Sequence, residues 1–190
     1  MTTVSIIGSG NMGSAIGAIV AAGGNSVEVV GREATAITGE IVVLAVPYPS
    51  LAEIVERHRD ALAGKIVVDL TNPLDFSTFD RLVVPADGSA AAELAAALPD
   101  SKVLKAFNTN FAATLASKTV GGAVPTTVLI AGDDESAKAA LAELVRAGGL
   151  EAVDAGSLAR ARELEAVGFL QLTLAVQERI SWTAGFALVK

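Results

Sequence analysis

Cysteine is absent from this chain of 190 residues, and histidine occurs only once, as His58. Without cysteine the chain can form no disulfide bridge, no thiolate metal site and no thiol nucleophile. A single histidine rules out metal sites that need several imidazoles. The sequence also has no G-x-S-x-G nucleophile motif and no carboxylate pair of glycosidase character. These absences exclude enzyme classes that depend on such groups.

Long hydrophobic runs are also missing. The longest is Ile41–Pro47, whereas about 18 apolar residues are needed to cross a bilayer. No basic residue precedes the first apolar run, so we expect no signal peptide and a cytoplasmic location. The net charge of −7 argues against nucleic acid as a partner, because phosphate binding needs clustered Lys and Arg.

Hydrophobic residues, by contrast, are abundant. They make up 52% of the chain, and the mean hydropathy is +0.53, which excludes intrinsic disorder. The length suits one good core and is too short for two ordinary domains with a linker. We therefore expect a single domain over residues 1–190.

Short apolar runs alternate with Ala-rich helical patterns along the chain. The strands are continuous apolar runs, which is typical of strands buried on both faces of a parallel sheet. This predicts a doubly wound, mainly parallel α/β sheet of Rossmann type, with helices on both faces. The expected strands are 4–7, 27–30, 41–46, 66–70, 102–107, 127–131 and 152–154, and the expected helices are 11–22, 49–63, 89–98, 134–147 and 157 to about 182.

One connection is unusually short, because only residues 33–40 separate the second expected strand from the third. A parallel crossover normally carries a helix and takes a dozen residues or more. Eight extended residues span at most ~27 Å, enough to return to the other side of the first strand. We expect the second crossover helix and its edge strand to be shortened or absent, which places 41–46 beside the first strand, opposite 27–30.

A glycine motif, G-x-G-x-x-G, follows the first strand. In this pattern the first glycine permits a tight turn, the second lets the backbone approach a pyrophosphate, and the third lets the helix pack closely on the sheet. Backbone N–H groups at the start of the helix then face the phosphates. The motif predicts dinucleotide binding by Gly8, Ser9, Gly10, Asn11, Met12 and Gly13.

The end of the second strand indicates which dinucleotide is bound. NAD-binding chains usually have Asp or Glu there for the ribose 2′-OH, whereas this chain has Gly31 and Arg32. Gly31 leaves room, and the guanidinium of Arg32 can pair with a 2′-phosphate. Glu28 comes three residues too early, and Glu33 can either neutralise Arg32 or bind a 2′-OH itself. We predict NADP over NAD.

Other loops that follow strands have unusual content. In this fold, ligands bind beyond the carboxyl ends of the strands. Prolines in the first such loop fix the backbone beside the expected nicotinamide ribose. In two later loops, the amides of Asn72 and Asn108 can donate to a carboxamide or a ring carbonyl. Asparagine also makes turns without a ligand, so this alternative stays open. The candidate residues are Ala45, Val46, Pro47, Asn72, Ala106, Phe107 and Asn108.

Several segments, in order, resemble the NADPH-dependent reductases of the deazaflavin coenzyme F420. The likeness extends over nearly the whole chain. It departs at Gly31, where the family commonly has Ser, and at Glu33, where it has further basic residues. The matching segments are 8–13, 45–47, Val68–Pro73, Lys105–Thr109, Ala131–Asp134, Asp154–Leu158 and Arg160–Glu165.

The resemblance implies hydride transfer between NADP(H) and a flavin-like ring, either F420 or a flavin. It carries over Ser9–Met12 for the pyrophosphate, Gly31 and Arg32 for the 2′-phosphate, Val46 and Pro47 for the nicotinamide ribose, and Ala106 for the ring. It also implies a homodimer. The apolar residues of 157–190 cover almost every face of the last expected helix, which predicts that this segment is buried, and we expect a dimer contact to cover it.

Two other functions also fit the sequence. A protein that binds or senses NADP(H) without chemistry needs no acid or base. A reductase of a small imine or carbonyl needs a proton donor, and Tyr48 is the only tyrosine. We expect no catalytic side chain for hydride transfer, a solvated surface position for His58, and a paired structural role for Asp69 and Lys105.

Overall fold

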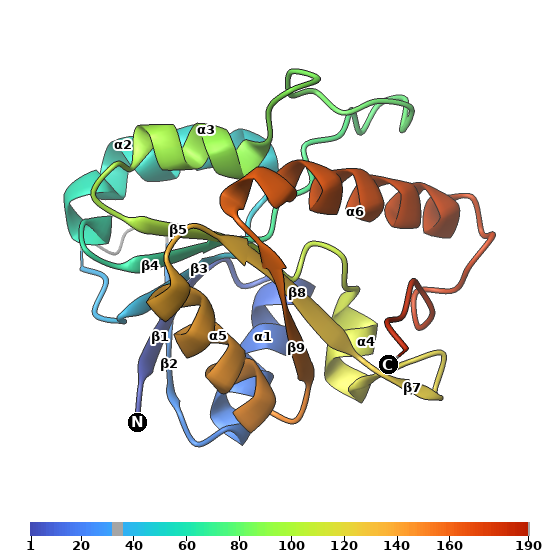
Figure 1. Ribbon diagram of the computed structural model, residues 1–190, viewed down its shortest axis with the longest axis horizontal. Coiled ribbons are helices and arrows are strands. Elements are labelled where there is room, and N and C mark those ends of the chain that lie inside the picture. Colours follow the sequence, from blue (N-terminus) through green and yellow to red (C-terminus); the bar gives the residue numbers. More distant parts are fainter. Residues whose placement is uncertain (32–35, 190) are drawn as a thin grey trace.

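A computed structural model describes residues 1–31 and 36–189 of the chain (Figure 1). Its main sheet has seven strands in the order β2-β1-β3-β4-β5-β8-β9. All neighbouring pairs are parallel except β5 and β8. The α/β prediction is confirmed. The strands are β1 (Thr3–Ile7), β2 (Ser26–Val30), β3 (Ile41–Leu44), β4 (Ile66–Asp69), β5 (Lys102–Ala106), β8 (Thr127–Gly132) and β9 (Glu151–Gly156).

Helices cover both faces of this sheet. In Figure 1, α2, α3 and α6 lie above it, and α1 and α5 lie below it. Each strand therefore needs apolar side chains on both sides, which explains the continuous apolar runs. The helices are α1 (Asn11–Ala22), α2 (Leu51–Leu62), α3 (Ala90–Ala97), α4 (Ala112–Ser117), α5 (Glu135–Ala147) and α6 (Ala161–Val176), with 3-10 turns η1 (Tyr48–Ser50) and η2 (Leu158–Arg160).

The third strand lies where the short connection predicts. β3 pairs with β1 on the side opposite β2. The described part of the connection contains no helix or strand. The Ser5 hydroxyl donates to Glu28, whose carboxylate also accepts from the Thr38 N–H at 3.0 Å. These bonds fix the returning chain against β1 and lower the pKa of Glu28.

Two apolar layers form the core, one on each face of the sheet. Alternate strand residues feed each layer: Val43 and Leu104 pack towards α1 and α5, whereas Val42 and Val103 pack towards α2 and α3. The edge of the sheet at which β1, β3, β4 and β5 end therefore lies between two packed layers, which hold the loops that follow these strands in place.

Some elements have no counterpart in the sequence prediction. Helix α4 follows β5, and a two-stranded ribbon of β6 (Thr119–Val120) and β7 (Val124–Pro125) precedes β8. This ribbon reverses the chain, so β8 runs antiparallel to β5.

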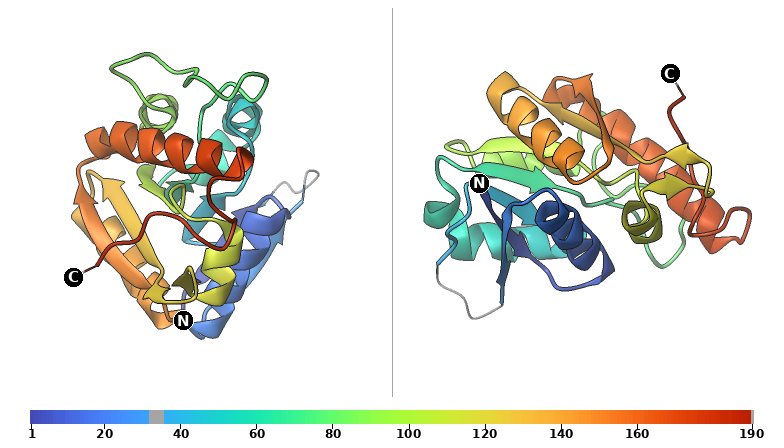
Figure 2. Two further views of the ribbon diagram at one scale, coloured as in Figure 1. Left: turned by 90° about the vertical axis from the view of Figure 1, so that its right-hand side faces the viewer. Right: turned by 90° about the horizontal axis from the view of Figure 1, so that it is seen from below.

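The C-terminal segment departs from the expected helix of 157 to about 182. The helix ends at Val176, and the remaining chain returns across the molecule (Figure 2). The prediction of burial on almost every face is wrong within this subunit, because Val167, Leu170 and Val176 are exposed by 37%, 51% and 43%. One face of α6 packs on the sheet, and the other presents these side chains to solvent.

Candidate functional site

The loop between β1 and α1 has a glycine where no other residue fits. Gly8 has a φ of 116°, and a Cβ there would overlap the carbonyl oxygen of Ala45. A Cβ at Gly13 would overlap the carbonyl oxygen of Gly8. At Gly10, the N-cap residue of α1, a Cβ would have no atom of the described residues within 4 Å. The first and third glycines therefore serve packing, and the second borders open space.

That open space belongs to a cavity of about 470 Å³, here called the phosphate-side cavity. In the part of the chain that the structure describes, no side chain caps the first turn of α1, so its N–H groups remain available for an anion. Gly31 borders the same cavity, and a Cβ there would have no atom of residues 1–31 or 36–189 within 4 Å apart from its chain neighbours. Arg32 lies outside the described residues. The predicted residues that line this cavity are Gly8, Ser9, Gly10, Gly31, Ala45, Val46 and Pro47.

Four residues of α2 line the phosphate-side cavity without having been predicted to do so: Glu53, Ile54, Arg57 and His58. Arg57 faces it and pairs with Glu53 at 3.2 Å. His58 faces it too, and the prediction of a solvated surface position is wrong, because His58 is only 6% exposed. Burial, with the charge of Arg57, lowers the pKa of His58. The charged residues around His58 concealed the inward face of this helix.

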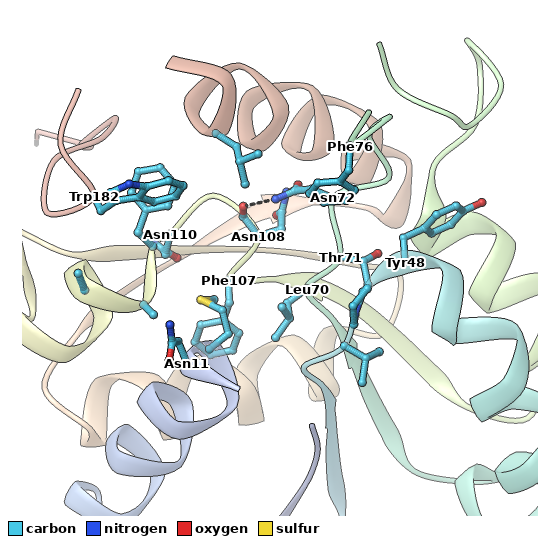
Figure 3. Close-up of a pocket in the computed structure, with 17 residues that line it drawn as sticks. Asn11, Tyr48, Leu70, Thr71, Asn72, Phe76, Phe107, Asn108, Asn110 and Trp182 are labelled. Carbon is cyan, nitrogen blue, oxygen red and sulfur yellow. Dashed lines mark hydrogen bonds between the residues drawn. The ribbon is translucent and has the colours of Figure 1, made fainter. Parts of the chain in front are cut away.

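A second cavity, of about 400 Å³, lies at the ends of β3, β4 and β5 (Figure 3). Here called the aromatic cavity, it shares Val46 and Pro47 with the phosphate-side cavity. The two cavities thus run along one edge of the sheet. The residues that line the aromatic cavity are Asn11, Met12, Val46, Pro47, Tyr48, Leu70, Thr71, Asn72, Phe76, Phe107, Asn108, Asn110, Phe111, Ala112, Ala113, Leu172 and Trp182.

The floor of the aromatic cavity begins where β5 ends. Ala106, the last residue of β5, is fully buried and lines neither cavity. Phe107 has a φ of 63°, a strained conformation for a bulky residue. This turn takes the chain out of β5 and along the cavity. The other candidates from the sequence that line the aromatic cavity are Asn11, Met12, Asn72 and Asn108.

Three buried oxygens in residues of the aromatic cavity have no hydrogen-bond partner among the described residues: Thr71 Oγ1, Asn108 Oδ1 and Asn110 Oδ1. The orientations of both amides are fixed. Asn110 Nδ2 donates to the Thr127 carbonyl at 3.0 Å, and Asn108 Nδ2 donates to the Leu164 carbonyl at 2.8 Å. Buried polar atoms are normally paired. The cavity floor therefore offers acceptors to a ligand that carries N–H or O–H groups.

Asn72 and Asn108 are joined by two hydrogen bonds, one of which is drawn in Figure 3. Asn72 Nδ2 donates to the Asn108 carbonyl, and Asn108 Nδ2 donates to Asn72 Oδ1, both at 2.9 Å. Gly168 of α6 packs directly on this pair. A Cβ at Gly168 would overlap Asn72 Oδ1 and lie 2.8 Å from the Asn108 carbonyl oxygen. The glycine lets α6 approach the two loops.

Tyr48 forms one wall of the aromatic cavity, and its hydroxyl points to α3. It donates to Glu93 Oε2 at 2.6 Å. This bond, helped by burial and by nearby carboxylates, raises the pKa of Tyr48 from 10.0 to about 12. The phenol is committed to Glu93 and is a poor proton donor near neutral pH.

The C-terminal tail closes the opposite wall. Gln171 of α6 donates to the Thr109 carbonyl at 2.9 Å and accepts from the Phe186 N–H at 2.7 Å. The Trp182 ring meets that of Phe111 edge to face, with centroids 4.9 Å apart. Figure 3 shows Trp182 and Tyr48 on opposite sides of the cavity.

Asp69, Lys105 and Glu165 form a buried ionic cluster behind the cavity floor. Lys105 Nζ lies 2.8 Å from Asp69 Oδ2 and 2.8 Å from Glu165 Oε1. The expectation that Asp69 and Lys105 are paired is confirmed, and the structure shows that they pair with each other. Burial raises the pKa of Glu165, while Lys105 and the Ala90 N–H oppose that rise. Glu165 ends the last segment of the family resemblance, but the sequence does not show its pairing with Lys105, because it lies in a helix that is distant along the chain.

The lining of the aromatic cavity limits its chemistry. Among the described residues that line it, Tyr48 alone has a titratable side chain. In the described ranges, no group of three or more His, Cys, Asp and Glu side chains is placed to hold a metal ion. None of the helices in those ranges is long and apolar enough to span a bilayer. The cavity suits flat, uncharged rings with a polar edge.

Comparison with known proteins assigns this chain to a family. A family model described as NADP oxidoreductase, coenzyme F420-dependent, matches residues 22–73. The F420-dependent NADP reductase of Methanocaldococcus jannaschii is 32% identical over 149 residues, which cover 76% of this chain and 66% of that protein. That of Methanothermobacter thermautotrophicus is 30% identical over 161 residues, which cover 82% of this chain and 68% of that protein. This chain belongs to the F420-dependent NADP reductase family.

The family resemblance predicted from the sequence is thus confirmed. A crystal structure of a protein from Arthrobacter sp. FB24 superposes on this family member with a TM-score of 0.86 over 100% of both chains, at 24% identity, which shows a shared fold. The matched segments span 66% and 68% of the two archaeal reductases, so part of each has no counterpart in the alignment.

Thr71 and Asn110 are candidate residues of this reductase-family site that sequence reasoning missed. Each lies within two residues of a predicted asparagine, so the signal was present in the same loops. A pattern cannot show which side chains in a loop point inwards. The structure singles them out by their buried, unpaired oxygens.

Proposed function

We propose that this protein transfers a hydride between NADP(H) and a flavin-like ring of the deazaflavin F420 type. One observation carries the proposal: the phosphate-side cavity continues, through Val46 and Pro47, into an aromatic cavity whose lining supplies no acid or base suited to neutral pH. A dinucleotide extended along this edge has its nicotinamide in the aromatic cavity. The curated archaeal relatives are named F420-dependent NADP reductases, which supports the choice of the partner ring.

The residues present fit NADP(H). Gly10 borders the free space in which a pyrophosphate would meet the N–H groups of α1. We assign the pyrophosphate to Gly8, Ser9, Gly10, Asn11 and Met12, with Gly13 in a packing role. The nicotinamide ribose is assigned to Ala45, Val46 and Pro47, and the ring to Thr71, Asn72, Phe107, Asn108 and Asn110, with Ala106 behind them.

NADPH, when bound, supplies a hydride from C4 of its nicotinamide ring. The protein's task is to hold two flat rings together and to exclude water. The rings of Tyr48, Phe107 and Trp182 provide flat apolar walls. The oxygens of Asn108 and Asn110 accept N–H groups from a carboxamide or a ring edge, which orients that ring without changing its charge.

Reduction of a small imine or carbonyl fits this cavity less well. It requires a proton donor over the nicotinamide, and the hydroxyl of Tyr48 is bonded to Glu93 with a pKa of about 12. A deazaflavin needs no such donor from the protein, because solvent can protonate its ring nitrogen.

Preference for NADP over NAD is part of the proposal. Arg32 remains the predicted ligand of the 2′-phosphate, and Arg57 lines the phosphate-side cavity from α2. A second cation from another element can replace the basic residues that the family has after the arginine. We also propose a homodimer that covers the exposed apolar side chains of α6 and the tail, including Leu170, Phe186 and Leu188.

Anaerobic assays with NADPH or NADH and oxidised F420 test the proposal. We expect NADPH oxidation coupled one-to-one to loss of the deazaflavin visible absorbance, with NADH about 100-fold less efficient. Arg32→Ala should remove most of this preference. Tight binding of NADPH without turnover of F420, flavins or quinones would instead support a sensing protein. Sedimentation analysis tests the dimer.

A further inference from the structure

The ammonium group of Lys105 has its bonding capacity filled. It donates to Asp69 Oδ2 at 2.8 Å and to the Thr71 carbonyl at 2.6 Å, and it lies 2.8 Å from Glu165 Oε1. Three acceptors match three N–H protons. The side chains of all three ionic residues are at most 1% exposed. Lys105 is thus a fully coordinated cation.

Both carboxylates face only donors in the described structure. Asp69 Oδ1 accepts from the Thr71 N–H at 2.8 Å. Glu165 accepts from the N–H groups of Ala90 and Ala91 at 3.0 and 3.3 Å. Burial raises the pKa of Glu165, whereas the Lys105 ammonium and the Ala90 N–H favour its ionised form. Two carboxylates beside one ammonium leave one excess negative charge, which the N-terminus of α3 offsets in part.

This charge lies close to the aromatic cavity. The cluster binds both backbone groups of Thr71, a residue that lines the cavity. The charges of Asp69 and Glu165 also contribute to the raised pKa of Tyr48, which lines the cavity. No described residue lining the cavity carries a formal charge at neutral pH. In such apolar surroundings the field of a buried charge is only weakly screened.

We propose that the excess negative charge of the Asp69–Lys105–Glu165 cluster favours binding of NADP⁺ relative to NADPH, and so makes bound NADPH a stronger hydride donor. The inference rests on the proposed function, which places the nicotinamide in this cavity. In the reaction, C4 of the nicotinamide transfers its hydrogen, with both electrons of the C–H bond, to a carbon of the acceptor ring. The nicotinamide ring thereby becomes a cation. Solvent supplies the proton that the acceptor ring takes up. Glu165 lines no part of the cavity and acts through its field.

Calorimetric titration of NADP⁺ and NADPH separately into the protein tests this. Glu165→Gln removes the excess charge. We expect the Kd of NADP⁺ divided by the Kd of NADPH to rise about fivefold. For a two-electron couple this equals a change of about 20 mV in the potential of the bound pair. Glu163→Gln is the matched control, since Glu163 lies on the same helix, 56% exposed and paired with Arg160. It should leave the ratio unchanged.

Two further variants separate charge from packing. Glu165→Asp keeps the charge and should keep the wild-type ratio, even where stability falls. Asp69→Asn removes the carboxylate charge on the other side of Lys105, and it should likewise raise the Kd of NADP⁺ relative to that of NADPH. This variant tests the inference even where the Glu165→Gln variant does not fold. Equal weakening of NADP⁺ and NADPH in the charge-removing variants would overturn the inference. Failure of the wild type to bind either dinucleotide would overturn the proposed function itself.

Discussion

The two cavities at the edge of the sheet are built in different ways. The phosphate-side cavity depends largely on backbone, from the glycine loop before α1 and the ends of β2 and β3, with side chains of α2 along one side. The aromatic cavity depends on side chains from separate strand ends, from α6 and from the tail. A site formed by backbone groups can be predicted from a short local sequence motif. A site formed by side chains requires that segments distant along the chain come together in the fold. Substitutions should therefore affect the two cavities separately.

The largest effect is expected for Gly10→Ala. A Cβ at Gly10 meets no atom of the described residues, so a bound pyrophosphate is what it would obstruct. We expect about 100-fold weaker binding of NADP⁺, with a loss of no more than about 1 kcal/mol in the free energy of unfolding. Calorimetry and denaturant unfolding measure the two quantities. Unchanged affinity would mean that the phosphates lie elsewhere.

Gly168→Ala should affect the aromatic cavity instead. The new Cβ would push α6 away from the Asn72–Asn108 pair, at a cost of about 2 kcal/mol in unfolding free energy. We expect about 30-fold slower F420 reduction and little change for an adenosine phosphate fragment without nicotinamide. Gly17→Ala in α1 is the control, because its Cβ would make only ordinary contacts. Equal turnover in both variants would contradict the account.

Asn110→Ala removes one of the unpaired oxygens on the cavity floor. We expect about tenfold weaker binding of whichever ligand donates to it, NADP⁺ or F420, and unchanged binding of the adenosine phosphate fragment. Asn25→Ala, at the opposite end of the sheet, should change neither. Normal affinity of Asn110→Ala for both ligands would leave that oxygen without a role.

The smallest effect concerns Tyr48, the only tyrosine of the chain. The pKa of its phenol should lie near 12, as followed by ultraviolet absorbance, because the protonated form donates to Glu93. Glu93→Gln removes that carboxylate and should lower the pKa of Tyr48 towards its ordinary value of 10.0. Glu56→Gln should not, although Glu56 lines a groove between α2 and α3 that Tyr48 and Glu93 also line. A wild-type pKa near 10.0 would show that the phenol is free to donate.

Much of the fold could be predicted because its signals are local. The eight residues 33–40 are too few for a helical crossover, and this placed β3 beside β1. The glycine motif predicted the turn between β1 and α1. Helix α6 was predicted too long, because the apolar composition of the last segment does not show where the chain turns back. The Gln171 contacts that hold the tail are long-range.

The candidate site was predicted in part, for the same reason. Asn72 and Asn108 stood out as polar residues after buried strands, and they do meet. His58 was misjudged because its neighbours along the helix are charged, while its own side chain faces inwards. The cluster partner Glu165 is 60 residues or more from Lys105 and Asp69 along the chain, and only packing of α6 brings it there.

The central claim is that two rings meet in the aromatic cavity and exchange a hydride directly. NADPH carrying deuterium at one or the other C4 position, reacted with oxidised F420, tests it. We predict that one of the two labelled forms passes its deuterium to the ring carbon of the reduced deazaflavin without dilution by solvent hydrogen. Deuterium released into water, or NADPH oxidation with an unlabelled product from both forms, would contradict the claim.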